Sequence, residues 1–149
     1  MTGGRRQRVS VVTLGVANLD RARAFYEEWG WTTHYSGEGI VFFQGNGLVI
    51  ALFGIEDLAA DQGRPGAALG TGAITLAQNY PTEVQVDERF RAAVAAGATI
   101  LKPPQKATWG GYSGYISDPD GHVWELAVNQ FWDLSEDGSV TMPDDAVGA

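Results

Sequence analysis

The chain has 149 residues and a formal net charge of −8, and it contains no cysteine. This length fits one compact domain or two small modules that share a core. The negative charge disfavours nucleic acid as a partner, and the lack of cysteine excludes disulfides and thiolate chemistry. No apolar run reaches the roughly 18 residues of a membrane span, and residues 1–8 lack a signal-peptide core. We therefore expect a cytoplasmic protein without membrane partners.

Residues 9–57 are predicted to form a first module with the order strand, helix, strand, strand, strand. Its helix is expected to begin at Asn18 or Asp20 as the cap and to end at Gly30. The predicted strands span 9–16, 31–36, 40–44 and 48–53. Both faces of the last strand are apolar, so one face should pack on a helix while the other lines an enclosed, dry cavity.

Residues 73–133 repeat this order after a linker at 58–72. Thr82 and Gln85 form a capping box before the second helix. The predicted strands are 73–77, 99–101, 111–117 and 122–128, and the first of them matches the first module by aligning Val12-Thr13-Leu14 with Ile74-Thr75-Leu76. The predicted fold class is α+β: a single domain at 9–133, with paired βαβββ modules forming a cupped mixed sheet and helices outside. Residues 1–8 are expected to be flexible, and 134–149 to form an acidic tail.

A turn at Asp118-Pro119-Asp120-Gly121 precedes a predicted strand whose successive side chains point to opposite faces of the sheet. Trp124 and Leu126 point to one side, which leaves Glu125 as a lone carboxylate on an otherwise apolar face. Glu125 is therefore predicted to face a pocket. Two interpretations remain open: a functional carboxylate that acts as a base or anchors a ligand, and a structural one that accepts hydrogen bonds from the backbone, Thr13 or Thr75.

Aromatic residues supply the second candidate feature of a binding site. Four of them fall on strands or loops that should border the cup: Phe42, Phe53, Trp109 and Tyr112. Together they favour a pocket for a planar or hydrophobic compound, although ordinary core packing explains any single one of them. Trp109 is the most suggestive, because Pro103-Pro104 and Gly110-Gly111 place it in a predicted loop.

From about residue 9 to 133 the sequence resembles the vicinal oxygen chelate superfamily, which includes glyoxalase I, extradiol dioxygenases, fosfomycin-resistance enzymes and bleomycin-binding proteins. The resemblance lies in Thr13-Leu14-Gly15-Val16 leading into Ala24-Phe25-Tyr26, and in the run from Asp118 to Leu126. Trp109-Gly110-Gly111-Tyr112 resembles a glyoxalase/bleomycin-resistance-like subgroup. Enzymes and non-catalytic binders share these motifs. The resemblance also implies a homodimer, and pairing of the two modules within one chain is equally consistent with the pattern.

Metallated members of this superfamily hold a metal with two residues per module, usually His and Glu on the first and last strands. The resemblance places these positions at Val11 and Ala51 in the first module, and at Ala73 or Thr75 and Glu125 in the second. One carboxylate cannot replace a full ligand set. His34 and His122 are expected to make surface or turn hydrogen bonds rather than to bind metal.

The sequence thus predicts a protein without metal or cofactor that binds a small organic molecule, as the drug-sequestering members do. The candidate ligand-binding residues are Thr13, Phe42, Phe53, Thr75, Trp109, Tyr112 and Glu125. The alternative is an enzyme, either a glyoxalase-like lyase or isomerase or a metal-free isomerase with Glu125 as its base. A third possibility is a dimeric scaffold whose own side chains fill the cup.

Overall fold

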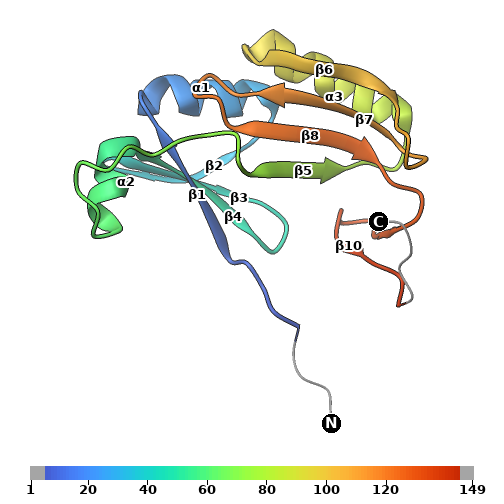
Figure 1. The fold of residues 1–149 in the computed structure, drawn as a ribbon, viewed down its shortest axis with the longest axis horizontal. Helices are drawn as coiled ribbons and strands as arrows, with labels where there is room; N and C mark the ends of the chain where they lie inside the picture. The colour runs from blue at the N-terminus through green and yellow to red at the C-terminus, as the bar shows by residue number, and fades with distance from the viewer. Residues whose placement is uncertain (1–5, 145–149) are drawn as a thin grey trace.

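A computed structural model describes residues 6–144 and confirms the predicted fold class (Figure 1). Two four-stranded mixed sheets, one per module, are joined by helices in a single α+β arrangement. Parts of the predicted terminal segments, 1–5 and 145–149, lie outside the described residues. Within the described part of the chain, no helix is long and apolar enough to cross a membrane.

The first module forms a sheet in the strand order β1-β4-β3-β2, with β1 parallel to β4. The Asn18 side chain accepts a hydrogen bond from the Arg21 backbone amide and caps the helix as predicted, and Gly30 ends it with φ of 124°. The elements are β1 (Val11–Val16), α1 (Leu19–Trp29), β2 (Thr33–Gly37), β3 (Ile40–Gln44) and β4 (Val49–Gly54).

The second module repeats this topology in the order β5-β8-β7-β6. Thr82 Oγ1 accepts from the Gln85 backbone amide at 3.2 Å, which confirms the predicted helix start. The elements are β5 (Thr75–Asn79), α3 (Glu83–Ala96), β6 (Thr99–Lys106), β7 (Tyr112–Ser117) and β8 (Val123–Val128). Strand β6 runs on through Pro103 and Pro104, which were expected in a loop. Because β6 is an edge strand whose register shifts there, it tolerates proline.

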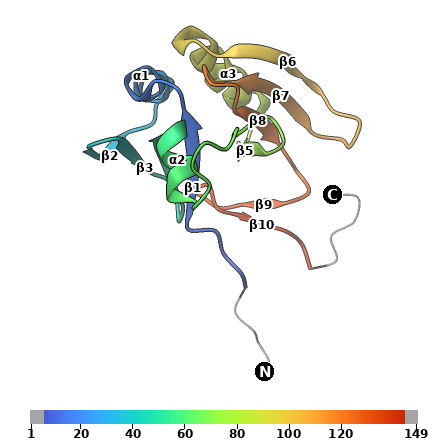
Figure 2. The ribbon, with the colours of Figure 1, turned by 60° about the vertical axis from the view of Figure 1, so that its left-hand side comes forward.

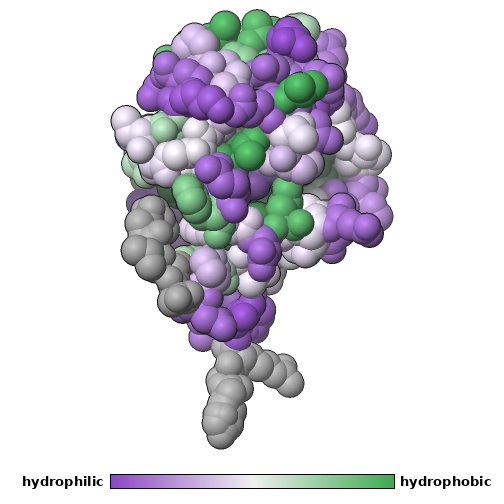
Figure 3. Space-filling model, turned by 90° about the vertical axis from the view of Figure 1, so that its right-hand side faces the viewer, coloured by the Kyte–Doolittle hydropathy of each residue, from purple (hydrophilic) through white to green (hydrophobic). Residues whose placement is uncertain are grey.

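One helix and two short strands were not predicted. Helix α2 (Ile55–Asp61) occupies the start of the expected linker; it is a short helix without a side-chain cap, so its sequence carries little signal. The short strands β9 (Asp133–Leu134) and β10 (Val140–Thr141) pair within the expected tail. Asn46 Nδ2 donates to the Asp137 carbonyl and to Ser139 Oγ, so this hairpin contacts the β3–β4 turn of the first module. On the face drawn in Figure 3, hydrophobic residues form separate patches between hydrophilic ones.

The two modules share one hydrophobic core. Helices α1 and α3 pack against each other on the same side of the two sheets (Figures 1 and 2). Trp124 of β8 crosses the boundary between the modules, and its ring lies 5.2 Å from that of Trp29, 5.7 Å from Trp31 and 6.1 Å from Tyr26. Edge-to-face and tilted aromatic pairs at such distances are favourable packing arrangements.

The turn at residues 118–122, which we call the inter-module turn, binds the first module through alternate residues. Asp118 Oδ2 accepts a hydrogen bond from the Tyr26 hydroxyl at 2.5 Å. Asp120 Oδ1 accepts from the Ala17 backbone amide at 2.8 Å, and the His122 ring bonds the Gly15 carbonyl at 2.7 Å. The turn that carries part of the family resemblance in the sequence therefore also holds the two modules together.

Strand registers give the true equivalence between the modules. Thr13 and Ala77 each lie five residues before the cap of the following helix, at Asn18 and Thr82, and they pair with Ala51 and Glu125 respectively. This spacing agrees with the predicted equivalence of Ala51 and Glu125. The alignment of Thr13 with Thr75 is wrong by two residues, because both first strands carry a similar Thr-Leu pair and only their hydrogen-bonded partners distinguish the registers.

The same strand registers indicate which residue of the second module corresponds to Val11 of β1. Val11 pairs with Val49 and Thr75 pairs with Val123, each two residues before the last-strand position of its module. Thr75, rather than Ala73, is thus the counterpart of Val11. Ala73 lies before β5 begins.

Candidate functional site

Each sheet has one face covered by α1 or α3 and an opposite face that we call the cup face. On β8, the buried Trp124 and Leu126 belong to the helix-covered face, so Glu125 lies on the cup face as the alternation predicted. Val11 is 47% exposed on the cup face of β1, and Thr13 and Thr75 are also exposed. Residues 6–144 therefore do not close the cup that the sequence predicted as an enclosed cavity.

The residues at the family's four metal positions do not fit a divalent ion. Val11 and Ala51 offer no ligand atom, Thr75 offers a hydroxyl, and Glu125 alone offers a carboxylate. Among residues 6–144 there is no group of three or more His, Cys, Asp or Glu side chains that could hold a metal ion. His34 is exposed on β2, and the His122 ring bonds a backbone carbonyl.

Glu125 has a cross-strand neighbour that the sequence reasoning missed. Tyr115 of β7 lies opposite Glu125 on the cup face. Burial, followed by the charge of the Glu125 carboxylate and its hydrogen bond, raises the pKa of Tyr115, so this hydroxyl stays protonated at neutral pH. Residues equally far from the centre of a hairpin turn pair with each other, and this rule could have placed Tyr115 opposite Glu125.

Only two of the four predicted aromatic residues lie together. Phe42 pairs with Ala51 on the cup face, and Phe53 lies opposite Ile40 on the same face. Trp109 lies in the turn between β6 and β7, at the outer edge of the second sheet, with its ring folded over Gly111.

Tyr112 lies on the helix-covered face, not in the cup. Its hydroxyl donates to Asp87 of α3 at 2.7 Å, and this bond, with smaller effects of burial and charge, raises the pKa of Tyr112 to about 12. The prediction that Tyr112 borders the cup is wrong. Tyr112 and the buried Ile116 are four residues apart on β7, so both side chains point to the face that α3 covers.

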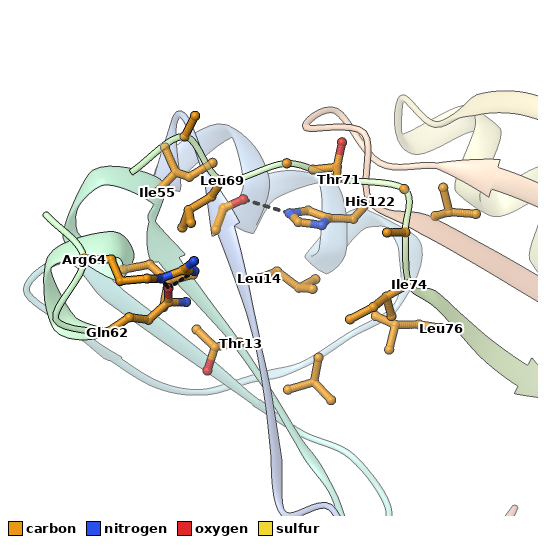
Figure 4. Close-up of a pocket in the computed structure, with 18 residues that line it drawn as sticks. Thr13, Leu14, Ile55, Gln62, Arg64, Leu69, Thr71, Ile74, Leu76 and His122 are labelled. Carbon is orange, nitrogen blue, oxygen red and sulfur yellow. Dashed lines mark hydrogen bonds between the residues drawn. The ribbon is translucent and has the colours of Figure 1, made fainter. Parts of the chain in front are cut away.

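A cavity of about 400 Å³, which we call the seam cavity, lies between edge strands β1 and β5, beside α2 and the segment that follows it (Figure 4). Its walls are largely apolar and include Val12, Leu14, Ile55, Leu58, Leu69, Ile74 and Leu76. A few polar side chains also line it, namely Thr13, Gln62, Arg64, Thr71 and His122. Thr13 is therefore the one predicted site residue that reaches this cavity.

Gly15 allows the wall formed by α2 to approach β1. A Cβ atom at Gly15 would lie 3.1 Å from Ile55 Cγ1 and 3.2 Å from Leu58 Cδ2, closer than ordinary contact. The Gly15 carbonyl in turn accepts the hydrogen bond from His122. Sequence reasoning missed Gln62, Arg64 and Thr71, because they lie in a predicted linker without periodic pattern. It weighed His122 only as a metal ligand or as a residue that makes surface or turn hydrogen bonds, not as part of a ligand site.

Paired βαβββ modules with a ligand-sized cavity at their junction define a class of small-molecule-binding and catalytic proteins. Residues 8–126 match the model of the Glyoxalase/Bleomycin resistance protein/Dioxygenase superfamily, and the chain belongs to this superfamily.

Solved structures of similar fold include a glyoxalase-related enzyme and a lactoylglutathione lyase. A glyoxalase-related enzyme from Fulvimarina pelagi is 38% identical, with a TM-score of 0.84 over 92% of this chain and 99% of that one. A lactoylglutathione lyase from Agrobacterium tumefaciens is 25% identical, with a TM-score of 0.69 over 87% of this chain and 98% of that one.

An uncharacterised protein of Mycobacterium bovis is 36% identical over 59 residues, which are 40% of this chain and 37% of that protein. The match thus spans little more than a third of this curated relative.

Proposed function

We propose that the protein binds a small organic molecule in the seam cavity and that it does so without a metal ion. The observation that carries this proposal is the cavity itself. Its volume of about 400 Å³ falls in the usual range of small-molecule sites, and apolar walls surround a few polar groups that can orient a ligand. A planar or hydrophobic compound suits such walls.

The residues at the four metal positions support binding without a metal ion. Sequestering a compound requires affinity but no bond-making, so it tolerates valine and alanine at positions where metallated relatives carry ligands. Trp109 and Tyr112 lie away from the seam cavity, so we do not include them in the proposed binding site.

Blocking the seam cavity is expected to abolish binding of a neutral apolar probe. Thr13→Trp would place a large ring in the cavity, whereas Thr75→Trp makes the same change on an exposed strand position that does not line it. With N-phenyl-1-naphthylamine as fluorescent probe, we expect Thr13→Trp to weaken binding roughly 10-fold or more and Thr75→Trp to leave it within about twofold. Because Thr13 and Thr75 both lie on the cup face, comparable losses in the two variants would place the ligand in the cup and contradict the proposed location.

A second candidate function is a metal-free isomerase or related enzyme, and the Glu125–Tyr115 pair favours it. A carboxylate beside a protonated tyrosine can serve as base and acid in the same reaction. This chemistry would occur on the cup face, so it is separable from binding in the seam cavity.

Glu125→Gln separates the two functions. We expect the purified protein to contain no stoichiometric metal and to show no turnover of the methylglyoxal–glutathione hemithioacetal, with or without added Ni²⁺ or Zn²⁺. Glu125→Gln should then leave probe binding unchanged, as should the control Glu88→Gln on the exposed side of α3. Metal-dependent turnover would overturn the binding proposal, and metal-free turnover lost by roughly 10²–10⁴-fold in Glu125→Gln alone would establish the enzyme.

The homodimer implied by the family resemblance stays a proposal. Val11 and Tyr35 expose apolar surface on the cup face of the first module, at 47% and 56%, which a second copy could cover. A native mass equal to the 15.9 kDa of one chain at micromolar concentration would contradict it.

A further inference from the structure

We propose that the ligand of the seam cavity is a small amphipathic anion whose acidic group binds Arg64 while its apolar part fills the space beside Leu14. This inference rests on the proposed binding function and adds the chemical class of the ligand. The cavity combines an oriented guanidinium at one side with apolar walls, and these are complementary to the two halves of such a molecule.

Gln62 and Arg64 are exposed residues of the cavity lining, and the Gln62 side chain orients the guanidinium of Arg64 there. Arg64 Nε donates to Gln62 Oε1 at 3.0 Å, and a second guanidinium nitrogen donates to the same oxygen. Within residues 6–144, Arg64 forms no salt bridge, in contrast to Arg21, Arg23 and Lys106. Its remaining N–H donors are therefore available to an anionic group, which a guanidinium binds in a bidentate manner.

The charge of the lining favours an anion over a cation. Among residues 6–144, no Asp or Glu lines the seam cavity. Arg64 is the residue of fixed charge in this lining. A cationic ligand would therefore meet like charge without a counter-ion, whereas an anion would gain charge-assisted hydrogen bonds.

The far side of the cavity carries a polar group of a different kind. His122 and Arg64 lie on opposite sides with Leu14 between them (Figure 4). The Gly15 carbonyl can only accept, so His122 Nε2 donates to it, and this bond orients the ring at the cavity. A ligand with an acidic group at one end and an apolar body matches this arrangement, and a polar group at its other end would lie near His122.

Two fluorescent probes that share one ring system isolate the contribution of the charge. The anionic probe is 8-anilinonaphthalene-1-sulfonate and the neutral probe is N-phenyl-1-naphthylamine, which lacks the sulfonate. We expect the wild type to bind both saturably and to prefer the anionic probe. Arg64→Gln should weaken the anionic probe roughly 10- to 100-fold, the range of a lost charge-assisted hydrogen-bond pair, and leave the neutral probe within about twofold.

Arg91→Gln is the matched control. Arg91 is exposed on α3 and does not line the cavity, and its substitution changes the net charge by the same amount as Arg64→Gln. It should alter neither probe, which excludes an effect of net charge alone. Circular dichroism and thermal unfolding of each variant exclude binding of the probes to partly unfolded protein.

The possible outcomes separate this inference from the function on which it rests. The anion site is supported if binding of the anionic probe is weakened in Arg64→Gln but not in Arg91→Gln. Equal binding of both probes, unchanged in Arg64→Gln, overturns the anion site and leaves small-molecule binding intact. An equal loss in Arg91→Gln also overturns it, because net charge would then explain the effect. Failure of the folded wild type to bind either probe overturns the proposed function itself.

Discussion

Replacing Asp118 with alanine is expected to lower the free energy of unfolding by roughly 3–5 kcal/mol, because several hydrogen bonds would lose their acceptor together. Asp118 is 3% exposed, and its carboxylate accepts from the Tyr26 hydroxyl, the Asp120 amide and the His122 amide at 2.5, 2.9 and 2.8 Å. Burial and the Asp118 charge raise the pKa of Tyr26 well above its usual value of 10, so its hydroxyl remains a donor at neutral pH.

Asp120→Asn provides a control in the same turn. Asp120 Oδ1 would still accept from the Ala17 amide, and within the described residues Oδ2 is buried without a hydrogen-bond partner. The ion pair with Arg21, whose side chain is 50% exposed, is lost, and the new amide group lies at the buried, unpartnered Oδ2 position, so we expect a cost of about 1–2 kcal/mol, still below that of Asp118→Ala. Equilibrium urea unfolding measures both variants. Equal costs for Asp118→Ala and Asp120→Asn would contradict the central role of Asp118.

Replacing Trp124 with alanine is the second change with a large expected effect, again roughly 3–5 kcal/mol. Trp124 is 2% exposed and fills the boundary between the modules against Trp29 and Trp31. Its Nε1 also donates to the Tyr26 hydroxyl at 3.1 Å. The variant would leave a cavity in the shared core, and the surrounding rings cannot fully close it.

Trp109→Ala is the matched control, since it makes the same chemical change at a side chain that is 39% exposed in the β6–β7 turn. We expect a cost below about 1 kcal/mol there. Guanidinium unfolding followed by far-ultraviolet circular dichroism compares the two without relying on tryptophan fluorescence. The idea of a shared core stabilised by Trp124 would be refuted if the two substitutions had similar costs.

The effects of Asp118 and Trp124 are not expected to add. Both side chains bond the same Tyr26 hydroxyl, one as acceptor and the other as donor. Substituting either one already disturbs that hydroxyl, so the double variant should cost less than the sum of the single variants.

Local patterns made the modules predictable. The helix starts at Asn18 and Thr82 depend on side chains that bond amides only three residues away, and sequence spacing displays this directly. Likewise, alternation along β8 was enough to place Glu125 on the face opposite Trp124, because successive strand side chains point in opposite directions.

Predictions that depend on which strand lies next to a residue were less successful. The sequence pattern aligns Thr13 with Thr75, although the strand pairing makes Ala77 the equivalent residue of the second module. Tyr112 was placed in the cup, although α3 covers its side of β7 and Asp87 binds its hydroxyl. In each case the local sequence was compatible with two arrangements, and contacts between distant segments selected one.

The repeated βαβββ order and the residue types at the family's four metal positions could be read from the amino-acid sequence, since both depend on residue identity and short spacing. The position of the proposed ligand site required the three-dimensional structure. The seam cavity joins Thr13, Arg64 and His122, which come from β1, the segment after α2 and the inter-module turn. Their proximity follows from the placing of edge strands β1 and β5 along the same cavity and from the Gly15–His122 hydrogen bond, and no local pattern encodes contacts between segments so far apart in the chain.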